Sequence, residues 1–412
     1  MVLLSHPTGN ANVRHAALGL FRAGLLKEFW TCLNFQAPAL LDRVLPGGIM
    51  GQLRRRSYPA ELATTIHTRS FHEVVRLLAP KVGFSGLVRH ETGRFSVDAV
   101  YHALDRAVAR RLTQADFRGV YAYEDGARFS FLEARRRGLR TFYDLPIGYW
   151  RAARTLLLDE AEREPEWAAT LTGNRDSAAK TERKDAELAL ADVVFVASTY
   201  TRRTLAEASD FKGAVVVVPY GAPVSPPANP PAAPAPGKKL RVLFVGSLGQ
   251  RKGLSYLFEA CRLVQSAVTL TVIGQKPQEP CAALDRELAG VRWIPSCPHQ
   301  QILAEMAAHD VFVFPSLFEG FGLVLLEALA AGLPIITTPH TAGPDLIQDG
   351  VEGFIVPIRD SRAIAERLEQ LHRDPTRLAE MSRQARRRAA ECSWAAYEET
   401  VAACVSQVLS RP

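Results

Sequence analysis

The sequence predicts an α/β protein of two domains, each built on a parallel sheet with helices on its faces. Three observations lead to this fold class. The chain has 412 residues, of which 47% are hydrophobic, so it can bury two cores of ordinary size. Short apolar runs alternate with helical stretches along most of its length. Residues 219–239 (PYGAPVSPPANPPAAPAPGKK) contain so much proline that we expect a semi-rigid linker there.

The predicted elements follow in order along the two halves. In the first domain, residues 1–218, the expected strands are 2–5, 119–123, 140–143, 193–198 and 214–218. The expected helices include 13–26, 96–112 and 181–189. In the second domain, residues 240–392, the expected strands are 240–246, 268–274, 310–315 and 334–338, followed by a turn and strand near 349–356. The last segment, 393–412, is expected to form a helix.

Composition argues for a large cytoplasmic enzyme. The opening MVLLSHPTGN has too few apolar residues for a secretory signal, and no apolar run approaches a membrane span. The six cysteines form neither a metal-like pair nor a dense framework, which indicates reduced thiols. His299, His309 and His340 each stand alone in the sequence, and no Asp-x-Asp pair occurs. We therefore expect no metal site.

The most informative stretch is VFVFPSLFEGFGLVLLEALAAGLP at 311–334. It predicts a buried strand, a loop that holds Glu319, and a helix from Leu323 to Ala331 that holds Glu327. Two glycines precede the helix, so a polar ligand could approach its free N–H groups and positive dipole end. Taken singly, either glutamate would be read as an ordinary surface residue. It is the combination that favours a binding site.

This combination resembles the donor-site signature of glycosyltransferase family 4, whose members are retaining enzymes of the GT-B fold, with two Rossmann-like domains facing a central cleft. The resemblance implies that Glu319 lies near the transferred sugar and that Glu327 accepts hydrogen bonds from the nucleotide ribose. It also implies that the backbone N–H groups of Phe321, Gly322 and Leu323 address sugar hydroxyls or phosphate oxygens. By the same analogy, the last helix would cross back onto the first domain.

A second motif, RVLFVGSLGQRKGLSYLFEA, predicts a strand, a tight turn and a helix. Arg251 and Lys252 stand where the helix begins, and two cations there would repel each other unless an anion lies between them. A bound diphosphate could be that anion. The alternative interpretation is a basic turn on the surface that binds no ligand. Relatives often carry an arginine after Gly246 where this chain has Ser247, so Arg251 is our candidate for that charge. The family also places nucleobase contacts near Ser296 and Cys297.

The first domain offers weaker candidates for residues that bind the donor or take part in catalysis. Gly9, Asn10 and Asn12 follow the first strand and could bring backbone N–H groups to the donor phosphate, or Asn10 could simply cap a helix. Many relatives place a histidine after the strand at 140–143. This chain has Tyr143 and Asp144 there instead, so Asp144 joins Glu319, Lys252 and Arg251 as a candidate catalytic residue. The acidic turn at 124–126 is another candidate, with turn chemistry as the alternative.

Charge is unevenly divided between the domains. Residues 1–218 contain 31 Lys and Arg against 24 Asp and Glu, which accounts for the whole formal excess of +7. Arginines cluster at 54–56, 110–111 and 135–137, and an apolar stretch at 45–50 precedes the first cluster. These features predict peripheral contact with an anionic membrane that carries the acceptor, or with an acidic polysaccharide; ordinary solvated faces are the alternative. Nucleic acid fits less well, because no aromatic-basic motif accompanies the clusters.

We therefore expect a metal-independent, retaining glycosyltransferase of glycan, polysaccharide or glycolipid biosynthesis. It would move a sugar from a nucleoside diphosphate, most readily UDP or GDP, to an acceptor hydroxyl. Fixed cations and a helix dipole can carry the leaving diphosphate without a metal ion. Two alternatives stay open: a sugar-nucleotide epimerase or phosphorylase on the same scaffold, and a sugar-nucleotide-binding protein without turnover.

Overall fold

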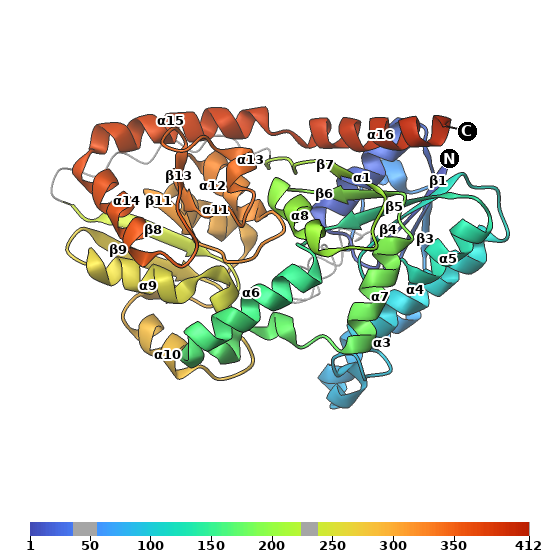
Figure 1. Ribbon diagram of the computed structural model, residues 1–412, viewed down its shortest axis with the longest axis horizontal. Coiled ribbons are helices and arrows are strands. Elements are labelled where there is room, and N and C mark those ends of the chain that lie inside the picture. The colour runs from blue at the N-terminus through green and yellow to red at the C-terminus, as the bar shows by residue number, and fades with distance from the viewer. Residues whose placement is uncertain (36–55, 224–237, 412) are drawn as a thin grey trace, which may run out of the picture.

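The computed structural model describes residues 1–35, 56–223 and 238–411, and these residues form two domains that lie side by side (Figure 1). In the described chain, the N-terminal sheet has the strand order β3-β2-β1-β4-β5-β6-β7 and the C-terminal sheet β10-β9-β8-β11-β12-β13. The pairings between these strands are parallel. The expected fold class, two parallel-sheet Rossmann-like domains, is confirmed.

The N-terminal domain alternates strands with helices. Its strands are β1 (Val2–Ser5), β2 (Leu26–Thr31), β3 (Ile66–Thr68), β4 (Gly119–Tyr123), β5 (Arg140–Leu145), β6 (Val193–Val196) and β7 (Ala214–Val217). Its α-helices are α1 (Ala11–Arg22), α3 (Phe71–Leu78), α4 (Val97–Leu112), α5 (Arg128–Arg136), α6 (Trp150–Arg163), α7 (Ala178–Ala189) and α8 (Thr199–Thr204). Short 3₁₀ turns are η2 (Ala60–Leu62), η3 (Ala79–Val82), η4 (Ser85–Val88), η5 (Pro165–Thr170), η6 (Thr172–Asn174) and η7 (Leu205–Glu207).

The C-terminal domain repeats the pattern. Its strands are β8 (Leu240–Val245), β9 (Val268–Ile273), β10 (Arg292–Ile294), β11 (Val311–Phe314), β12 (Ile335–Thr337) and β13 (Gly353–Ile355). Its helices are η8 (Gln250–Lys252), α9 (Leu254–Leu263), α10 (Ala282–Ala289), α11 (His299–Ala307), α12 (Leu323–Ala331), α13 (Gly343–Leu346), α14 (Ser361–Arg373), α15 (Pro375–Glu391) and α16 (Trp394–Ser410). Strands β8, β11 and β12 are buried along their whole length or nearly so, as expected for the centre of a parallel sheet.

One expected helix is wrong in its extent. The stretch 13–26 was predicted to be helical, but α1 ends at Arg22 and Leu26 opens β2. Strand β2 has the sequence LKEFWT, whose charged residues hide its strand character. It forms because its backbone pairs with β1 on one side and β3 on the other. The hydrophobic pattern of the sequence does not predict that pairing.

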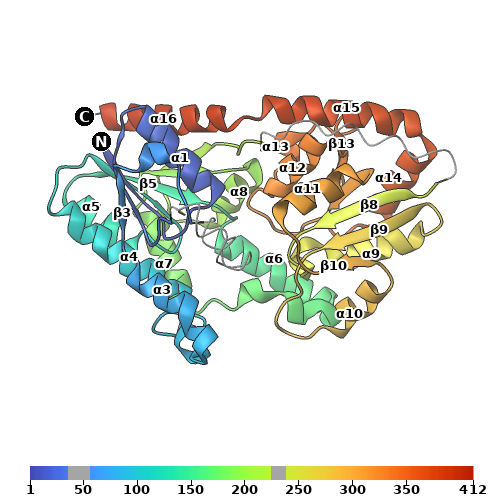
Figure 2. The same ribbon diagram turned by 180° about the vertical axis from the view of Figure 1, so that it is seen from behind.

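Two segments connect the domains in space (Figures 1 and 2). The last helix, α16, lies along α1 of the N-terminal domain. Helix α6 and the turn η5 extend in the other direction, to the C-terminal domain, where the Trp167 ring stacks on Phe258 of α9 with centroids 6.1 Å apart. We call residues 150–176 the arm. Among the described helices, none combines the length and apolar content that crossing a membrane requires.

Candidate active site

Two loops of the C-terminal sheet meet at the carboxyl ends of the neighbouring strands β8 and β11. At Gly253, which has a φ of 71°, a Cβ atom would overlap the carbonyl oxygen of Pro315, so only glycine allows this approach. The Leu317 N–H and the Ser316 hydroxyl both donate to the carbonyl of Arg251, at 2.9 and 3.2 Å. The backbone thus joins the two motifs that the sequence singled out.

Three charged side chains converge where these loops touch. Lys252 forms an ion pair and hydrogen bond with the Glu319 carboxylate. Arg251 Nη1 lies 3.2 Å from the same carboxylate and donates to the carbonyl of Phe318 at 2.6 Å. Lys252 Nζ also lies 4.6 Å from the centre of the Phe314 ring. Two cations therefore share one carboxylate, and the group keeps a net positive charge.

Burial and these neighbours shift the pKa values of the pair. Burial lowers the pKa of Lys252 and the charge of Arg251 adds to this effect, while Glu319 opposes both; the resulting pKa is about 8. For Glu319 burial would raise the pKa, but Lys252 and Arg251 outweigh it, so the carboxyl pKa lies below its usual value. Near neutral pH the carboxylate is ionised, and Lys252 is charged but close to losing its proton.

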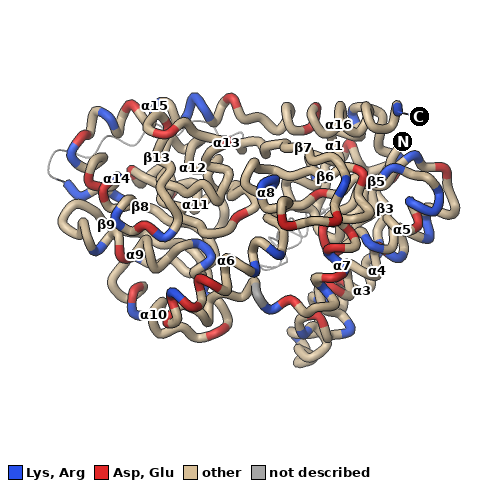
Figure 3. Tube along the Cα trace, in the orientation of Figure 1, with Lys and Arg blue, Asp and Glu red and all other residues tan. Residues whose placement is uncertain are grey.

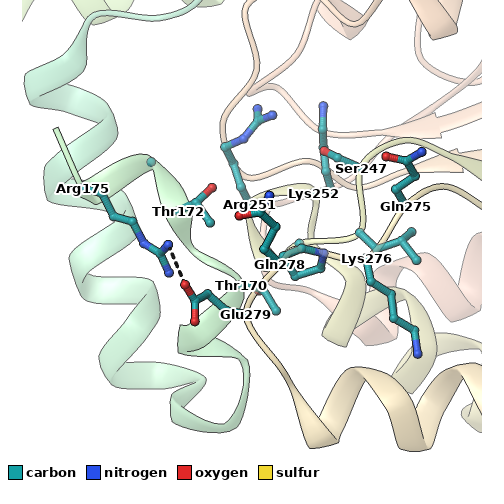
Figure 4. A pocket seen from close by; sticks show the side chains of 14 residues that line it. Thr170, Thr172, Arg175, Ser247, Arg251, Lys252, Gln275, Lys276, Gln278 and Glu279 are labelled. Atoms are coloured by element: carbon teal, nitrogen blue, oxygen red, sulfur yellow. Dashed lines mark hydrogen bonds and ion pairs between the residues drawn. The ribbon is translucent and has the colours of Figure 1, made fainter. Parts of the chain in front are cut away.

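A cavity of 370 Å³ opens beside this group (Figure 4). Its wall from the C-terminal domain includes Ser247, Arg251, Lys252, Gln275 and Lys276, and its wall from the arm includes Thr170, Thr172 and Arg175. The Arg175–Glu279 ion pair, 3.2 Å long, stands at one edge in Figure 4. Each lining cation also has a carboxylate partner, Lys276 with Asp285 and both Arg251 and Lys252 with Glu319; because two cations share Glu319, an excess of positive charge remains. Such a cavity suits a polyanion.

Glu327 and the predicted nucleobase loop lie close together. Glu327 is half-buried on α12, and its carboxylate is 3.7 Å from Nε2 of His299, so this histidine, which stands alone in the sequence, has a partner in the structure. Burial raises the pKa of Glu327, and His299 opposes that shift. His299 begins α11 directly after the loop that holds exposed Ser296 and half-buried Cys297. A carboxylate, an imidazole and a loop backbone therefore share one surface.

The start of α12 keeps its donors available. In the described chain, the N–H groups of Phe321, Gly322 and Leu323 have no protein acceptor, whereas the N–H of Glu319 bonds to the carbonyl of His340 at 3.1 Å. The carbonyl of Gly320 accepts hydrogen bonds from Ser198 and Thr201 of the N-terminal domain, at 2.5 and 2.9 Å. The loop that carries Glu319 is therefore held by both domains.

The N-terminal candidates do not join this group. Gly9 and Asn10 line a separate cavity of 550 Å³, together with Arg14 and Arg56. Asn10 occupies the N-cap position of α1, but its side chain makes no capping hydrogen bond. Asn12 is buried within the N-terminal domain. Gly246 and Ser247, by contrast, belong to the turn after β8, and Ser247 lines the cavity beside Lys252.

Asp144 is not placed against the cavity as a catalytic group would be. Only 3% of it is exposed, and its carboxylate accepts a hydrogen bond from the Tyr121 hydroxyl at 2.8 Å. Burial raises its pKa to about 7. The second acidic candidate, Glu124, is also enclosed, with its carboxylate 3.4 Å from Lys184. Both lie in strand or strand-end positions where the sheet buries them, which their sequence context did not show.

The arm supplies residues that sequence reasoning missed. Glu160 of α6 is fully buried and accepts hydrogen bonds from Gln250 at 2.7 Å, Tyr256 at 2.9 Å and Arg359 at 2.6 Å. The Gln250 N–H donates to the hydroxyl of Thr170 at 2.9 Å. Gln250 begins the turn η8, which carries Arg251 and Lys252. The N-terminal domain thereby positions both cations, and no motif in the sequence signals this.

Two domains of this kind, with charged loops at the carboxyl ends of the second sheet, define the GT-B class of folds, and solved structures agree. Sucrose-phosphate synthase from Thermosynechococcus elongatus aligns with a TM-score of 0.61 at 18% identity, over 99% of this chain and 99% of that one. Anabaena HepE in complex with UDP and glucose aligns with a TM-score of 0.58 at 15% identity, over 98% and 99%. At such identities the likeness concerns the fold.

The sequence match lies in the C-terminal half. Residues 227–388 match the family model described as glycosyl transferases group 1. A Salmonella typhimurium protein named as a colanic acid biosynthesis glycosyltransferase, WcaL, is 32% identical over 152 residues, 34% of this chain and 37% of its own. The amylovoran biosynthesis glycosyltransferase AmsK of Erwinia amylovora is 33% identical over 145 residues, 32% of this chain and 36% of its own. The chain spans little more than a third of the length of these two relatives.

Proposed function

We propose that this protein is a retaining, metal-independent glycosyltransferase that moves a sugar from a nucleoside diphosphate to an acceptor hydroxyl. The observation that carries the proposal is the convergence of Lys252 and Arg251 on Glu319 beside a cationic cavity. The match of residues 227–388 to group 1 glycosyl transferases supports it, since it covers all three residues. The relatives named for colanic acid and amylovoran favour polysaccharide biosynthesis as the setting.

The donor is assigned to the site part by part. Its diphosphate would lie against Lys252, Arg251 and the free N–H groups at the start of α12, where charge and helix dipole favour an anion. Its ribose would lie against Glu327, because an ionised carboxylate can accept both hydroxyls of a cis-diol. We take UDP or GDP as the nucleotide, and the UDP complex of HepE supports UDP.

The chemistry follows from where the charges lie. As the bond to the anomeric carbon breaks, negative charge grows on the leaving phosphate, and Lys252 and Arg251 stabilise it there. The acceptor hydroxyl attacks from the same face, and the departing phosphate oxygen takes its proton. This course needs no strong side-chain base, which agrees with the enclosed position of Asp144. The configuration at the anomeric carbon is retained.

Incubation with UDP- and GDP-sugars tests the proposal. We expect consumption of one donor by transfer or slow hydrolysis, and NMR of the product from an α-linked donor should show the α configuration. A chelator should leave the rate unchanged. An inverted anomer, or a rate lost with chelator and restored by a divalent ion, would contradict the proposal. A new sugar epimer would indicate an epimerase, and binding without consumption a binding protein.

Donor affinity should fall as pH rises through about 8. The diphosphate binds the charged form of Lys252, whose pKa in the free protein is about 8, so affinity is level below that pH and falls at most tenfold per pH unit above it. Below the pH at which the uracil or guanine base loses a proton, a sugar nucleotide keeps a constant charge, and calorimetry can follow its dissociation constant there. Lys252→Arg is the matched control. Arginine stays charged over this range, so the affinity of this variant should not fall above about pH 8. The same fall in affinity in that variant would show that a group other than Lys252 causes the pH dependence.

A further inference from the structure

The N-terminal domain carries an exposed apolar surface whose residues do not line the cavity of the candidate active site. It is formed by α3, η3 and η4, and we call residues 71–87 the apolar tip. Phe71, Val82 and Phe84 are exposed to 66%, 65% and 63%, and Val74, Leu78 and Leu87 are exposed as well. More than half of the exposed large hydrophobic side chains in the described chain lie in this short segment. In Figures 1 and 2 the segment projects beyond the rest of its domain.

Helix α3 is built with its polar side inward, which explains this exposure. Glu73 is buried and forms ion pairs with Arg56 at 2.9 Å and Arg76 at 2.7 Å. Because a helix has opposite faces, fixing Glu73 against the domain turns Phe71, Val74 and Leu78 to the solvent. A soluble domain would ordinarily bury that apolar face, so a contiguous exposed patch marks an interaction surface.

The fully exposed charges near the apolar tip are basic. Arg69, Lys81, Arg89 and Arg94 are exposed. Glu73 is buried, and Glu91 is half-buried with its carboxylate 3.3 Å from His90. Figure 3 shows acidic as well as basic positions in this part of the chain; Glu73 is buried, and half-buried Glu91 and Asp176 both lie beside His90, so the fully exposed charges near the tip are the basic ones. Exposed apolar side chains ringed by cations match the interface of an anionic bilayer.

The arginine clusters predicted from the sequence fit this role less well. Arg54 and Arg55, and the apolar stretch 45–50, lie outside the described residues. Arg56 is paired with Glu73, and Arg111 with Glu28 at 2.6 Å. Arg135 is paired with Asp192 at 3.0 Å. These pairs neutralise part of the charge that the clusters would bring to a membrane, whereas Arg110 and Arg137 are exposed.

We propose that the apolar tip inserts into the headgroup region of an anionic lipid bilayer. Phe71, Val82 and Phe84 enter the boundary of the acyl chains, and the surrounding cations contact lipid phosphates. The cavity of the candidate active site lies elsewhere, between the arm and the C-terminal domain, and stays open. This inference goes beyond the proposed function, because it does not depend on which reaction the cavity catalyses.

Cosedimentation with lipid vesicles tests the inference. The full chain should sediment with vesicles that contain phosphatidylglycerol at low salt, and much less with phosphatidylcholine alone. Replacing Phe71, Val82 and Phe84 together by Ser should weaken binding about tenfold or more. Replacing Lys81, Arg89 and Arg94 together by Ser should weaken it on the order of a hundredfold and reduce its salt dependence. The matched control replaces three exposed apolar residues elsewhere, Leu132, Leu158 and Leu263, by Ser and should bind like the unchanged chain.

The depth to which the apolar tip inserts into the bilayer is tested by fluorescence quenching with brominated lipids. Phe84→Trp should add emission that these lipids quench, whereas Leu263→Trp should not. Equal binding to both vesicle types, equal loss in the control variant, or absence of quenching at position 84 would overturn the inference. So would a dimer in solution that the Phe71, Val82 and Phe84 replacements dissociate, because it would assign the surface to a second copy of the chain.

Discussion

Glu319→Gln is expected to tighten binding of the free nucleoside diphosphate about tenfold and to lower turnover about a hundredfold. In the free protein the Glu319 carboxylate occupies the place between Lys252 and Arg251 and competes with an incoming diphosphate. Gln keeps the shape of the side chain but removes this competition. Turnover falls because the charged contact assigned to the sugar is lost. Calorimetry with the nucleoside diphosphate and initial rates with the sugar nucleotide measure the two effects.

Glu327→Ala is the matched comparison, because it removes the second glutamate of the same motif without touching the cations. It should weaken binding of the nucleotide and the sugar nucleotide alike, by about ten- to a hundredfold. The free Glu319→Gln protein should also unfold at a lower temperature, since two largely buried cations lose their counter-ion, and nucleotide should restore more stability to it than to the unchanged protein. Weaker nucleotide binding in Glu319→Gln would contradict the competition.

Glu160→Ala is expected to cost about 3–5 kcal/mol of unfolding free energy. The substitution leaves Gln250 and Tyr256 without their buried acceptor and removes one of the two carboxylates that pair with Arg359, the other being Asp159. It also frees the turn η8, so donor affinity should fall even at temperatures where the protein stays folded. Denaturant unfolding measures the first effect, and donor titration at low temperature measures the second.

Glu166→Ala provides the control for this prediction. Glu166 lies on the same arm and also pairs with the C-terminal domain, through Arg286 at 2.8 Å, but both side chains are exposed. Its loss should change the unfolding free energy by no more than about 1 kcal/mol. Equal effects of the two substitutions would mean that Glu160 does not position the turn. Glu160→Gln keeps the shape of the side chain but not its charge. Its loss of unfolding free energy should lie between those of Glu160→Ala and Glu166→Ala.

Much of the fold could be predicted because local chemistry decides it. Strands β1 and β4 coincide with the apolar runs 2–5 and 119–123, and α12 spans Leu323–Ala331 as predicted between its glycines. Buried strands of a parallel sheet are apolar on both faces, so they stand out in any sequence. Strand β2 could not be predicted in this way because it contains charged residues. It forms a strand because its backbone pairs with β1 and β3.

The sequence by itself determined the two parallel sheets and the residue types of the candidate site, since apolar runs, glycines and paired charges are local features. Only the tertiary structure decided which of these meet. It placed Lys252 on Glu319, joined Glu160 to Gln250 across the domains, enclosed Asp144 and turned the apolar face of α3 to the solvent. These outcomes depend on contacts between residues far apart in the chain, and the free energy of such contacts comes from burial and pairing that no single segment contains.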